Sequence, residues 1–140
     1  MTNRSLAEIV RRQRSSTLPL NATVKEAGAV MRDKRIGAIL VTDDAGRLAG
    51  LFTGRDAVCR VLAEGRDPAT TRLGAVMTPR PDTLDPRARA IDALRIMQNA
   101  GYRHMPIVED GCIVGIVSLG DFKGLERARL DEETGFWEIL

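Results

Sequence analysis

The feature that most constrains the fold of this chain of 140 residues is an internal repeat. The stretch GLFTGRD at Gly50–Asp56, here the first motif, recurs 65 positions later as GIVSLGD at Gly115–Asp121, the second motif. Upstream, the copies align at a spacing of 66, because the turn DDAG of the first copy is one residue longer than the turn EDG of the second. A chain that repeats in this way is expected to build one structural unit twice.

Hydrophobic periodicity gives both copies the same order of elements. Apolar residues three and four positions apart predict an amphipathic helix at residues 23–34 and again at 87–100. Two β-prone stretches around a tight Asp/Gly turn follow each helix, and a second helix begins near Gly54 or Leu119. The expected strands are Ala38–Thr42, Leu48–Thr53, His104–Glu109 and Cys112–Ser118, preceded by short β-prone pieces at Ser16–Leu20 and Val76–Pro79. The predicted order is therefore β-α-β-β-α, twice.

These patterns predict an α+β fold in which the two repeats pack sheet-to-sheet with pseudo-two-fold symmetry, since one copy alone would bury too little apolar surface. Leu6, Ile9 and Val10 form the apolar face of a helix that precedes the repeats. Phe136 and Trp137 are expected to contact a dimer partner or their own domain. The predicted boundaries are 1–15 for the N-terminal helix, 16–64 for repeat 1, 65–75 for a linker, 76–130 for repeat 2 and 131–140 for a C-terminal tail.

Composition argues against several classes of function. A net charge of +2 and an aromatic content of 4% do not favour a nucleic-acid partner, and the cluster RRQR at Arg11–Arg14 is expected to be a solvated helix end. One histidine and two separated cysteines, Cys59 and Cys112, predict no metal site and reduced thiols, as in a cytoplasmic protein. No apolar run is long enough for a membrane span. No nucleophile–base pair or phosphate-binding P-loop is visible, so we expect no enzyme, no catalytic residue and no catalytic cofactor.

The repeated motif has two interpretations from its residues alone. Thr53 and Ser118 could cap a helix, with Asp56 and Asp121 as acidic residues at the third helical position. Alternatively, each carboxylate could accept hydrogen bonds from both hydroxyls of a ribose, beside a helix N-terminus that attracts phosphate. The glycine that opens each motif would let a planar base or a backbone approach the strand closely. Both roles stay open at this point, and one residue can serve both.

The chain resembles a tandem pair of CBS (cystathionine β-synthase) domains, also called a Bateman module. The matching text is VKEAGAVMRDKRIGAILVTDDAGRLAGLFTGRDAVCRVLAEG with VMTPRPDTLDPRARAIDALRIMQNAGYRHMPIVEDGCIVGIVSLGDF, and the resemblance covers roughly residues 16–129. It implies a stand-alone, bacterial-type regulatory module that binds AMP, ADP, ATP or NAD in the clefts between the repeats. It also implies energy sensing, a disc-like homodimer and an unidentified target protein. The alternatives are an S-adenosylmethionine-binding pair and a ligand-independent dimerisation or protein-interaction adaptor.

The resemblance further implies a set of nucleotide-binding residues. Arg103 and His104 would meet phosphates, whereas the first copy has Gly37 and Ala38 at the matching positions and Arg55 as a possible replacement. Two unequal sites are therefore expected, for example one for NAD and one for AMP. The candidate ligand-binding residues are Thr17, Ile36, Gly37, Ala38, Thr53, Arg55, Asp56, Thr78, Pro79, Tyr102, Arg103, His104, Met105, Pro106, Ser118 and Asp121.

Several of these candidates also have a purely structural interpretation. Arg103 could be a solvated surface charge, His104 a satisfied core or interface residue, and Thr78 a participant in simple strand pairing. Met105 and Pro106 would line an adenine pocket through backbone and apolar contacts.

Overall fold

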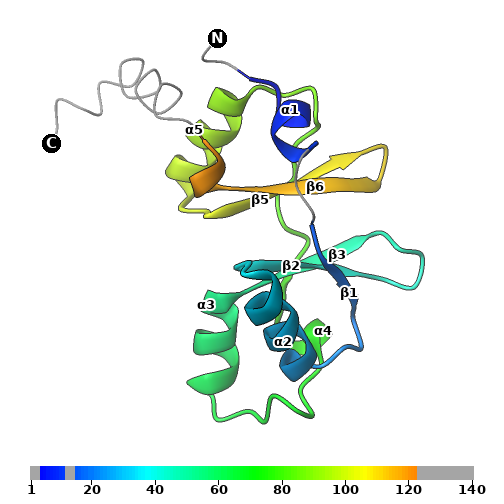
Figure 1. Ribbon diagram of the computed structural model, residues 1–140. Coiled ribbons are helices and arrows are strands. Elements are labelled where there is room, and N and C mark those ends of the chain that lie inside the picture. The colour runs from blue at the N-terminus through cyan, green and yellow to red at the C-terminus, as the bar shows by residue number, and fades with distance from the viewer. Residues whose placement is uncertain (1–3, 12–14, 123–140) are drawn as a thin grey trace, which may run out of the picture. The chain divides into compact units, whose positions relative to one another are not determined.

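The computed structural model describes residues 4–11 and 15–122 and divides the chain into two compact units, each mixing helices and strands as an α+β fold requires (Figure 1). The first-repeat unit is Ser15–Pro81, and the second-repeat unit combines Met1–Arg14 with Asp82–Leu140. Three expectations lie outside the described residues. They concern positions 12–14 of the arginine cluster, the second helix beyond residue 122, and the tail with Phe136 and Trp137.

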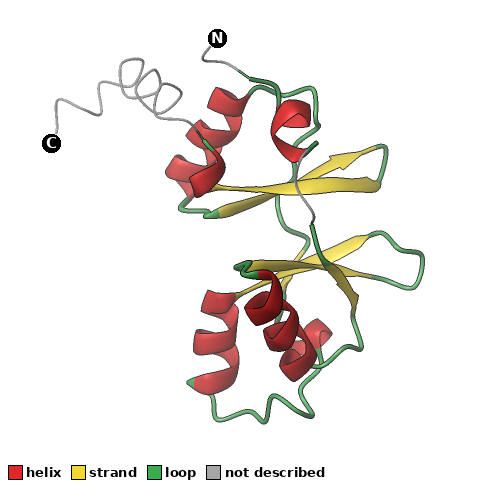
Figure 2. Ribbon diagram, viewed as in Figure 1, coloured by secondary structure: helices red, strands yellow, loops and turns green. Residues whose placement is uncertain are grey.

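The first-repeat unit is a four-stranded sheet with its helices on one face (Figure 2). The strands, in sheet order, are β1 (Thr17–Pro19), β2 (Ala38–Thr42), β3 (Leu48–Thr53) and β4 (Thr78–Pro79). The helices are α2 (Val24–Lys34), α3 (Gly54–Asp56), the π-helix η1 (Ala57–Leu62) that continues it, and α4 (Leu73–Val76). β1 runs parallel to β2, and the other neighbouring strands are antiparallel. The buried core between sheet and helices includes Phe52 and Leu73, both without exposed surface.

The second-repeat unit is built around an antiparallel pair, β5 (His104–Glu109) and β6 (Cys112–Ser118). The helices α1 (Leu6–Val10) and α5 (Ala90–Ala100) lie on one face of this pair, and the 3₁₀ turn η2 (Leu119–Asp121) follows β6 (Figures 1 and 2). The pattern that predicted an amphipathic helix is reproduced in α5, whose apolar face is buried.

The N-terminal helix is part of the core of the second-repeat unit. Leu6, Ile9 and Val10 are all buried, as the sequence spacing predicted. Two backbone hydrogen bonds dock the start of α1, one from the Leu6 N–H to the Ala88 carbonyl and one from the Ala7 N–H to the Pro86 carbonyl, both 2.8 Å. The first residues of the chain therefore complete the second repeat and not the first.

The two short β-prone pieces between the repeats pair with different units. Thr78–Pro79, expected to begin the second repeat, forms β4 and pairs with β3 of the first-repeat unit. Leu84 takes the matching place in the second repeat through a parallel bridge to Ile107, with a hydrogen bond from the Leu84 N–H to the Pro106 carbonyl (3.1 Å). The prolines of this segment lack the N–H that a longer strand would need, which keeps both pieces short.

The end of the first helix also differs between the repeats. α2 ends at Arg35 in the left-handed conformation with φ of 56°, whereas α5 ends at Gly101 with φ of 77°. These positions match at the spacing of 66. A side chain at a left-handed C-cap is unfavourable compared with glycine, so at this C-cap the first repeat carries backbone strain that the second does not.

Candidate functional site

The first motif closes strand β3 and opens helix α3 through a network around one carboxylate. The Thr53 N–H and the Thr53 hydroxyl both donate to Asp56 Oδ2, at 2.9 and 3.1 Å. In return, the Asp56 N–H donates to Thr53 Oγ1 at 3.2 Å, which completes a capping box. Asp56 is buried, with 8% of its surface exposed. The helix start is therefore fixed by the same two residues that the ligand hypothesis names.

The second motif repeats this geometry at the end of β6. The Ser118 N–H donates to Asp121 Oδ2 at 2.7 Å, and the Ser118 hydroxyl donates to the same oxygen at 3.2 Å. Asp121 is only half-buried. The Asp121 backbone carbonyl accepts a hydrogen bond of 2.8 Å from the Arg4 guanidinium, which the N-terminal segment supplies. The two motifs thus share their internal bonds but differ in burial and in what holds them from outside.

The capping interpretation of the motif is confirmed by these bonds, and it leaves part of each carboxylate available. In both motifs, Oδ2 receives the backbone N–H and the hydroxyl, which uses the two lone-pair directions of one oxygen. The second oxygen of each carboxylate keeps acceptor capacity. A ligand hydroxyl could therefore bind without first dismantling the helix cap.

Arg60 is a neighbour of the first motif that the sequence pattern did not single out. Its Nε lies 3.6 Å from Asp56 Oδ1. Its Nη1 donates to the carbonyl of Met77 at 2.7 Å and to that of Val76 at 3.4 Å, in the segment that leads into β4. The spacing of four residues between Asp56 and Arg60 is an ordinary signal for a helical ion pair. The carbonyl partners, however, are known only from the fold.

Other residues of the chain fill the space beside the glycine of each motif, where a side chain would lie. A Cβ at Gly50 would lie 2.8 Å from the Thr78 carbonyl oxygen and would also meet the Met77 side chain. A Cβ at Gly115 would lie 2.9 Å from Val10 Cβ of α1. The expected close approach is therefore made by the Thr78 backbone and Met77 at the first glycine and by Val10 at the second. These groups lie where the ligand hypothesis would put the planar base of a nucleotide.

The residues that enter β2 and β5 lie beside the two motifs. The Gly54 N–H donates to the Gly37 carbonyl and the Leu119 N–H to the Arg103 carbonyl, both at 3.1 Å. Ala38 pairs with Thr53 in the same way as His104 pairs with Ser118. The predicted correspondence between the strand entries is thus present in the backbone. Side chains that could carry positive charge stand at this place only in the second repeat.

His104 lies close enough to the second motif for the Asp121 carboxylate to affect its pKa. Burial lowers the pKa of His104 below its ordinary value, the Asp121 carboxylate raises it, and the Arg103 guanidinium lowers it. Burial is the largest of these effects. The imidazole is therefore held towards its neutral form, in which one ring nitrogen donates and the other accepts.

Other candidates in the second repeat are engaged elsewhere. The Tyr102 hydroxyl donates to Asp82 Oδ2 at 2.6 Å, and this bond raises the pKa of Tyr102. The Met105 side chain is fully buried in the core, and the Pro106 carbonyl accepts the bond from Leu84. In this structure the Met105 side chain is therefore not accessible, whereas Tyr102 is exposed with its hydroxyl bonded to Asp82.

The remaining candidates belong to the first-repeat unit. Thr17 is exposed and pairs with Leu40, while Ile36 is half-buried against the core. Arg55 is exposed one position before Asp56. Thr78 and Pro79 pair with Leu51 and Gly50 of β3. Each unit therefore gathers its own motif and strand entry, and Thr78 and Pro79 belong with the first motif.

Three further expectations concern chemistry that the chain could carry. The described residues hold no group of three or more His, Cys, Asp or Glu side chains that could bind a metal ion. Within residues 4–11 and 15–122, none of the helices is both long enough and apolar enough to cross a membrane. Cys59 and Cys112 are free and exposed.

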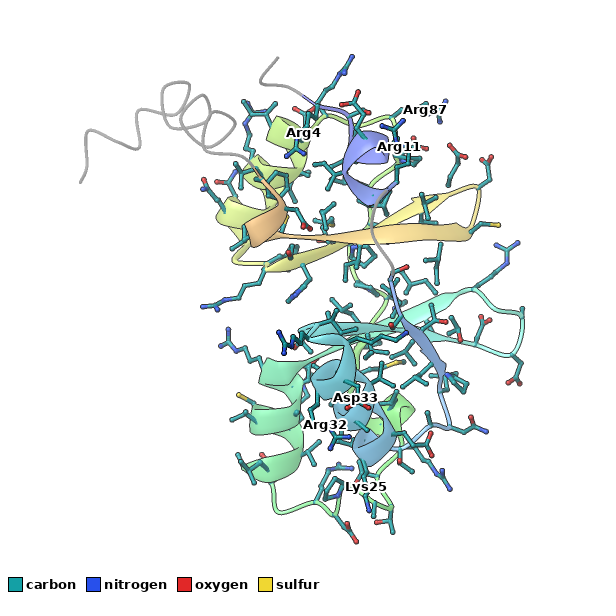
Figure 3. The ribbon with its side chains drawn as sticks, viewed as in Figure 1. Arg4, Arg11, Lys25, Arg32, Asp33 and Arg87 are labelled. Atoms are coloured by element: carbon teal, nitrogen blue, oxygen red, sulfur yellow. The ribbon has the colours of Figure 1, made fainter. Side chains whose placement is uncertain are left out.

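The labelled arginines in Figure 3 include Arg4, which reaches the second motif, and Arg87, which pairs with Asp85 at 2.9 Å.

Comparisons with known proteins show the family to which this chain belongs. The family model described as CBS domain matches residues 6–62 and 73–125. The CBS domain-containing protein YhcV of Bacillus subtilis (strain 168) is 37% identical over 106 residues, covering 76% of this chain and 74% of YhcV. The protein CBSCBSPB3 of Arabidopsis thaliana is 34% identical over 110 residues, which is 79% of this chain, yet this chain spans only 20% of that relative. The structure of CBS domain protein PAE2072 from Pyrobaculum aerophilum, complexed with AMP, has a TM-score of 0.81 at 22% identity and covers 91% of this chain and 98% of its own.

Proposed function

Because this chain belongs to the CBS-domain family and carries two CBS domains in tandem, we propose that it is a non-catalytic regulatory module that binds adenine nucleotides through its two motifs. The paired carboxylates carry this proposal. Each carboxylate accepts bonds from the hydroxyl and the backbone N–H of the Thr53 or Ser118 residue in its motif, and it keeps its second oxygen as an acceptor. Such an oxygen suits the vicinal hydroxyls of a ribose, since hydrogen bonds to a charged acceptor are strong.

The surroundings of the two motifs favour unequal ligands. Arg103 and His104 stand beside the second motif, where they would meet phosphate oxygens. In the first motif the candidate cations are Arg55 and Arg60, which lie on the helix side instead. AMP, ADP, ATP and NAD are all candidates, and AMP is tested first because a protein of similar fold is complexed with it.

Binding regulates only if the ligand favours one arrangement of the protein over another. We expect a homodimer in the cytoplasm that passes this difference to a target protein. Two free, exposed cysteines are compatible with a reducing compartment.

Titration calorimetry tests the proposal. AMP, ADP, ATP, NAD and S-adenosylmethionine are titrated into the wild type, Asp56→Ala, Asp121→Ala and the double variant. Losing a charge-assisted hydrogen bond costs about 1.5–3 kcal/mol, so each single variant should weaken its own site by about tenfold or more. Thr23→Ala is the matched control, because it removes the N-cap of α2 without touching either motif. Equal affinities in the wild type and the double variant would contradict the assignment of both sites.

A second function is favoured by one observation. The cap bonds alone already occupy both motif hydroxyls, and the chain itself fills the space above both glycines, so each motif is held by contacts within the chain. An adaptor that dimerises or binds a protein partner would need nothing more. Light scattering and thermal-shift measurements separate the two functions. An adaptor shows an oligomer and a specific partner but no thermal shift with any adenosyl ligand.

A further inference from the structure

Arg60 touches both the first motif and the segment that leads into β4. The Nε of its guanidinium lies near Oδ1 of Asp56, and its Nη1 donates to the Met77 and Val76 carbonyls. Arginine suits this task because its planar fork holds several donors in fixed directions. The side chain of Arg60 is 47% exposed and that of Asp56 is 11% exposed, so the pair lies at the edge of the unit and not in its core.

The oxygen next to Arg60 is the one that the helix cap leaves available. Thr53 uses Oδ2 of Asp56 twice, while Arg60 faces Oδ1. A separation of 3.6 Å is too long for a strong hydrogen bond, so Oδ1 retains room for a ligand donor while staying under the influence of the positive charge. A hydroxyl that binds this oxygen would lie next to Arg60.

The segment held by Arg60 in turn packs on the first motif. Met77 and Thr78 occupy the space above Gly50, and Thr78 pairs with Leu51. The contacts therefore form a closed ring that runs from Gly50 along the motif to Asp56, through Arg60 to Met77, and back to Gly50. A movement of the Asp56 carboxylate can therefore be transmitted to β4 by the Arg60 side chain alone.

The two motifs differ at the sequence position that matches Arg60. The position that matches Arg60 at the spacing of 65 is Leu125, which carries no charge. The second motif is instead bonded by Arg4 at the Asp121 carbonyl. An arginine from the following helix, beside the carboxylate itself, is thus a feature of the first motif.

We propose that Arg60 is a positioning residue of the first motif, which orients the Asp56 carboxylate for the vicinal hydroxyls of a nucleotide and links their binding to the Val76–Thr78 segment. This rests on the proposed function. Removal of Arg60 weakens binding at the first motif and loosens the segment before β4. Binding at the second motif is unaffected.

The experiment uses the full chain with Asp121→Ala in the background, so that only the first motif binds. Arg60→Gln and Arg60→Lys are compared with Arg66→Gln, a matched control whose residue is exposed in the loop after η1. AMP is the first probe, followed by ATP and NAD. Hydrogen exchange of the amides of Met77–Arg80 is measured with and without probe.

We expect Arg60→Gln to weaken binding about twofold to fivefold, within the range of a partly exposed ion pair, and to speed exchange at Met77–Arg80 even without probe. Arg60→Lys should restore part of the affinity through its charge but should leave exchange fast, because an ammonium cannot span both partners as a planar fork does. Arg66→Gln should match the background protein in both measurements.

Two results would overturn the inference. Unchanged affinity and unchanged exchange in Arg60→Gln would show that the contacts of Arg60 position nothing. If no probe binds the background protein, the first motif is not a nucleotide site, and the proposed function fails as a whole only if the wild type binds no probe either. Faster exchange in Arg60→Gln would then support only the link to the Val76–Thr78 segment and would overturn the ligand-positioning role.

Discussion

Replacing Gly50 by alanine should test how tightly β4 is packed on the first motif. The added Cβ would lie 2.8 Å from the Thr78 carbonyl oxygen and 2.9 Å from Met77 Cγ. The methionine can adopt another rotamer, but the carbonyl belongs to the backbone that pairs with β3. The substitution therefore forces β4 away from its neighbour.

The expected loss follows from the cost of overpacking, which is about 1–3 kcal/mol. In a chain of this size each kcal/mol lowers the melting temperature by about 3 °C, so Gly50→Ala should melt about 3–9 °C below the wild type. Gly115→Ala should lose less, because its new Cβ meets only the Val10 side chain of the short helix α1. That helix can shift more easily than a paired strand.

Gly28→Ala supplies the matched control. Gly28 lies inside α2, and a Cβ there would meet no heavy atom within 4 Å. Alanine is more favourable than glycine in a helix by about 0.5–1 kcal/mol, so this variant should be more stable than the wild type. The same chemical change is thus expected to have opposite signs at two positions of one unit.

Urea denaturation followed by circular dichroism, with calorimetry, measures these differences. Because the chain has two compact units, each transition is fitted separately when two are resolved. The reasoning fails if Gly50→Ala is as stable as Gly28→Ala, since β4 would then not be held at the distance described.

Three further predictions concern single residues. Thr53→Ala should lower stability by about 1 kcal/mol through loss of the cap hydroxyl, seen as a lower urea midpoint with unchanged slope, and Thr53→Ser should restore most of it. Arg35→Gly should raise the melting temperature, because it places glycine at a left-handed C-cap as in the second repeat; a lower value would mean that the arginine makes a compensating contact. His104 has a folded-state pKa below its ordinary value of 6.5, so the unfolded chain binds the proton first as the pH falls. The unfolding free energy should therefore be full above pH 6.5 and decline below it, and His104→Asn should remove that part of the pH dependence.

The sequence was sufficient to place most elements of the fold. All four long strands lie where alternating and continuous apolar stretches between turn residues predicted them, from Ala38–Thr42 to Cys112–Ser118. The helix α5 begins at Ala90 and not at Arg87, because Asp85 accepts from the Arg87 N–H at 2.8 Å and forms a turn there. Periodicity identifies such a helix well but leaves its first turn to local side chains.

Pairing partners were harder to predict than elements. Thr78–Pro79 was correctly assigned a β tendency, yet that tendency does not name the strand with which it pairs, and the partner proved to be β3. The bond from Tyr102 to Asp82 and those from Arg60 to Val76 and Met77 join residues far apart in the chain. Such contacts depend on tertiary geometry, which spacing alone does not encode.

The cap bonds of both motifs, by contrast, were predictable because they are local. Hydroxyl, two residues and aspartate at a strand-to-helix junction are enough to specify them. Whether the same carboxylates also bind a ribose depends on a molecule outside the chain.

The placement of α1 has a consequence for how the protein acquires its structure during synthesis. The first-repeat unit is continuous, so all its residues leave the ribosome before the second repeat is complete. Leu6, Ile9 and Val10 are made before the first-repeat unit, but the helix and strands that bury them are made after it. Until then the apolar face of α1 stays uncovered, although every residue of the first-repeat unit has already been made. The second-repeat unit can close only after the residues that follow Asp82 have been made, and that interval is when the nascent chain is most exposed to aggregation or to a chaperone.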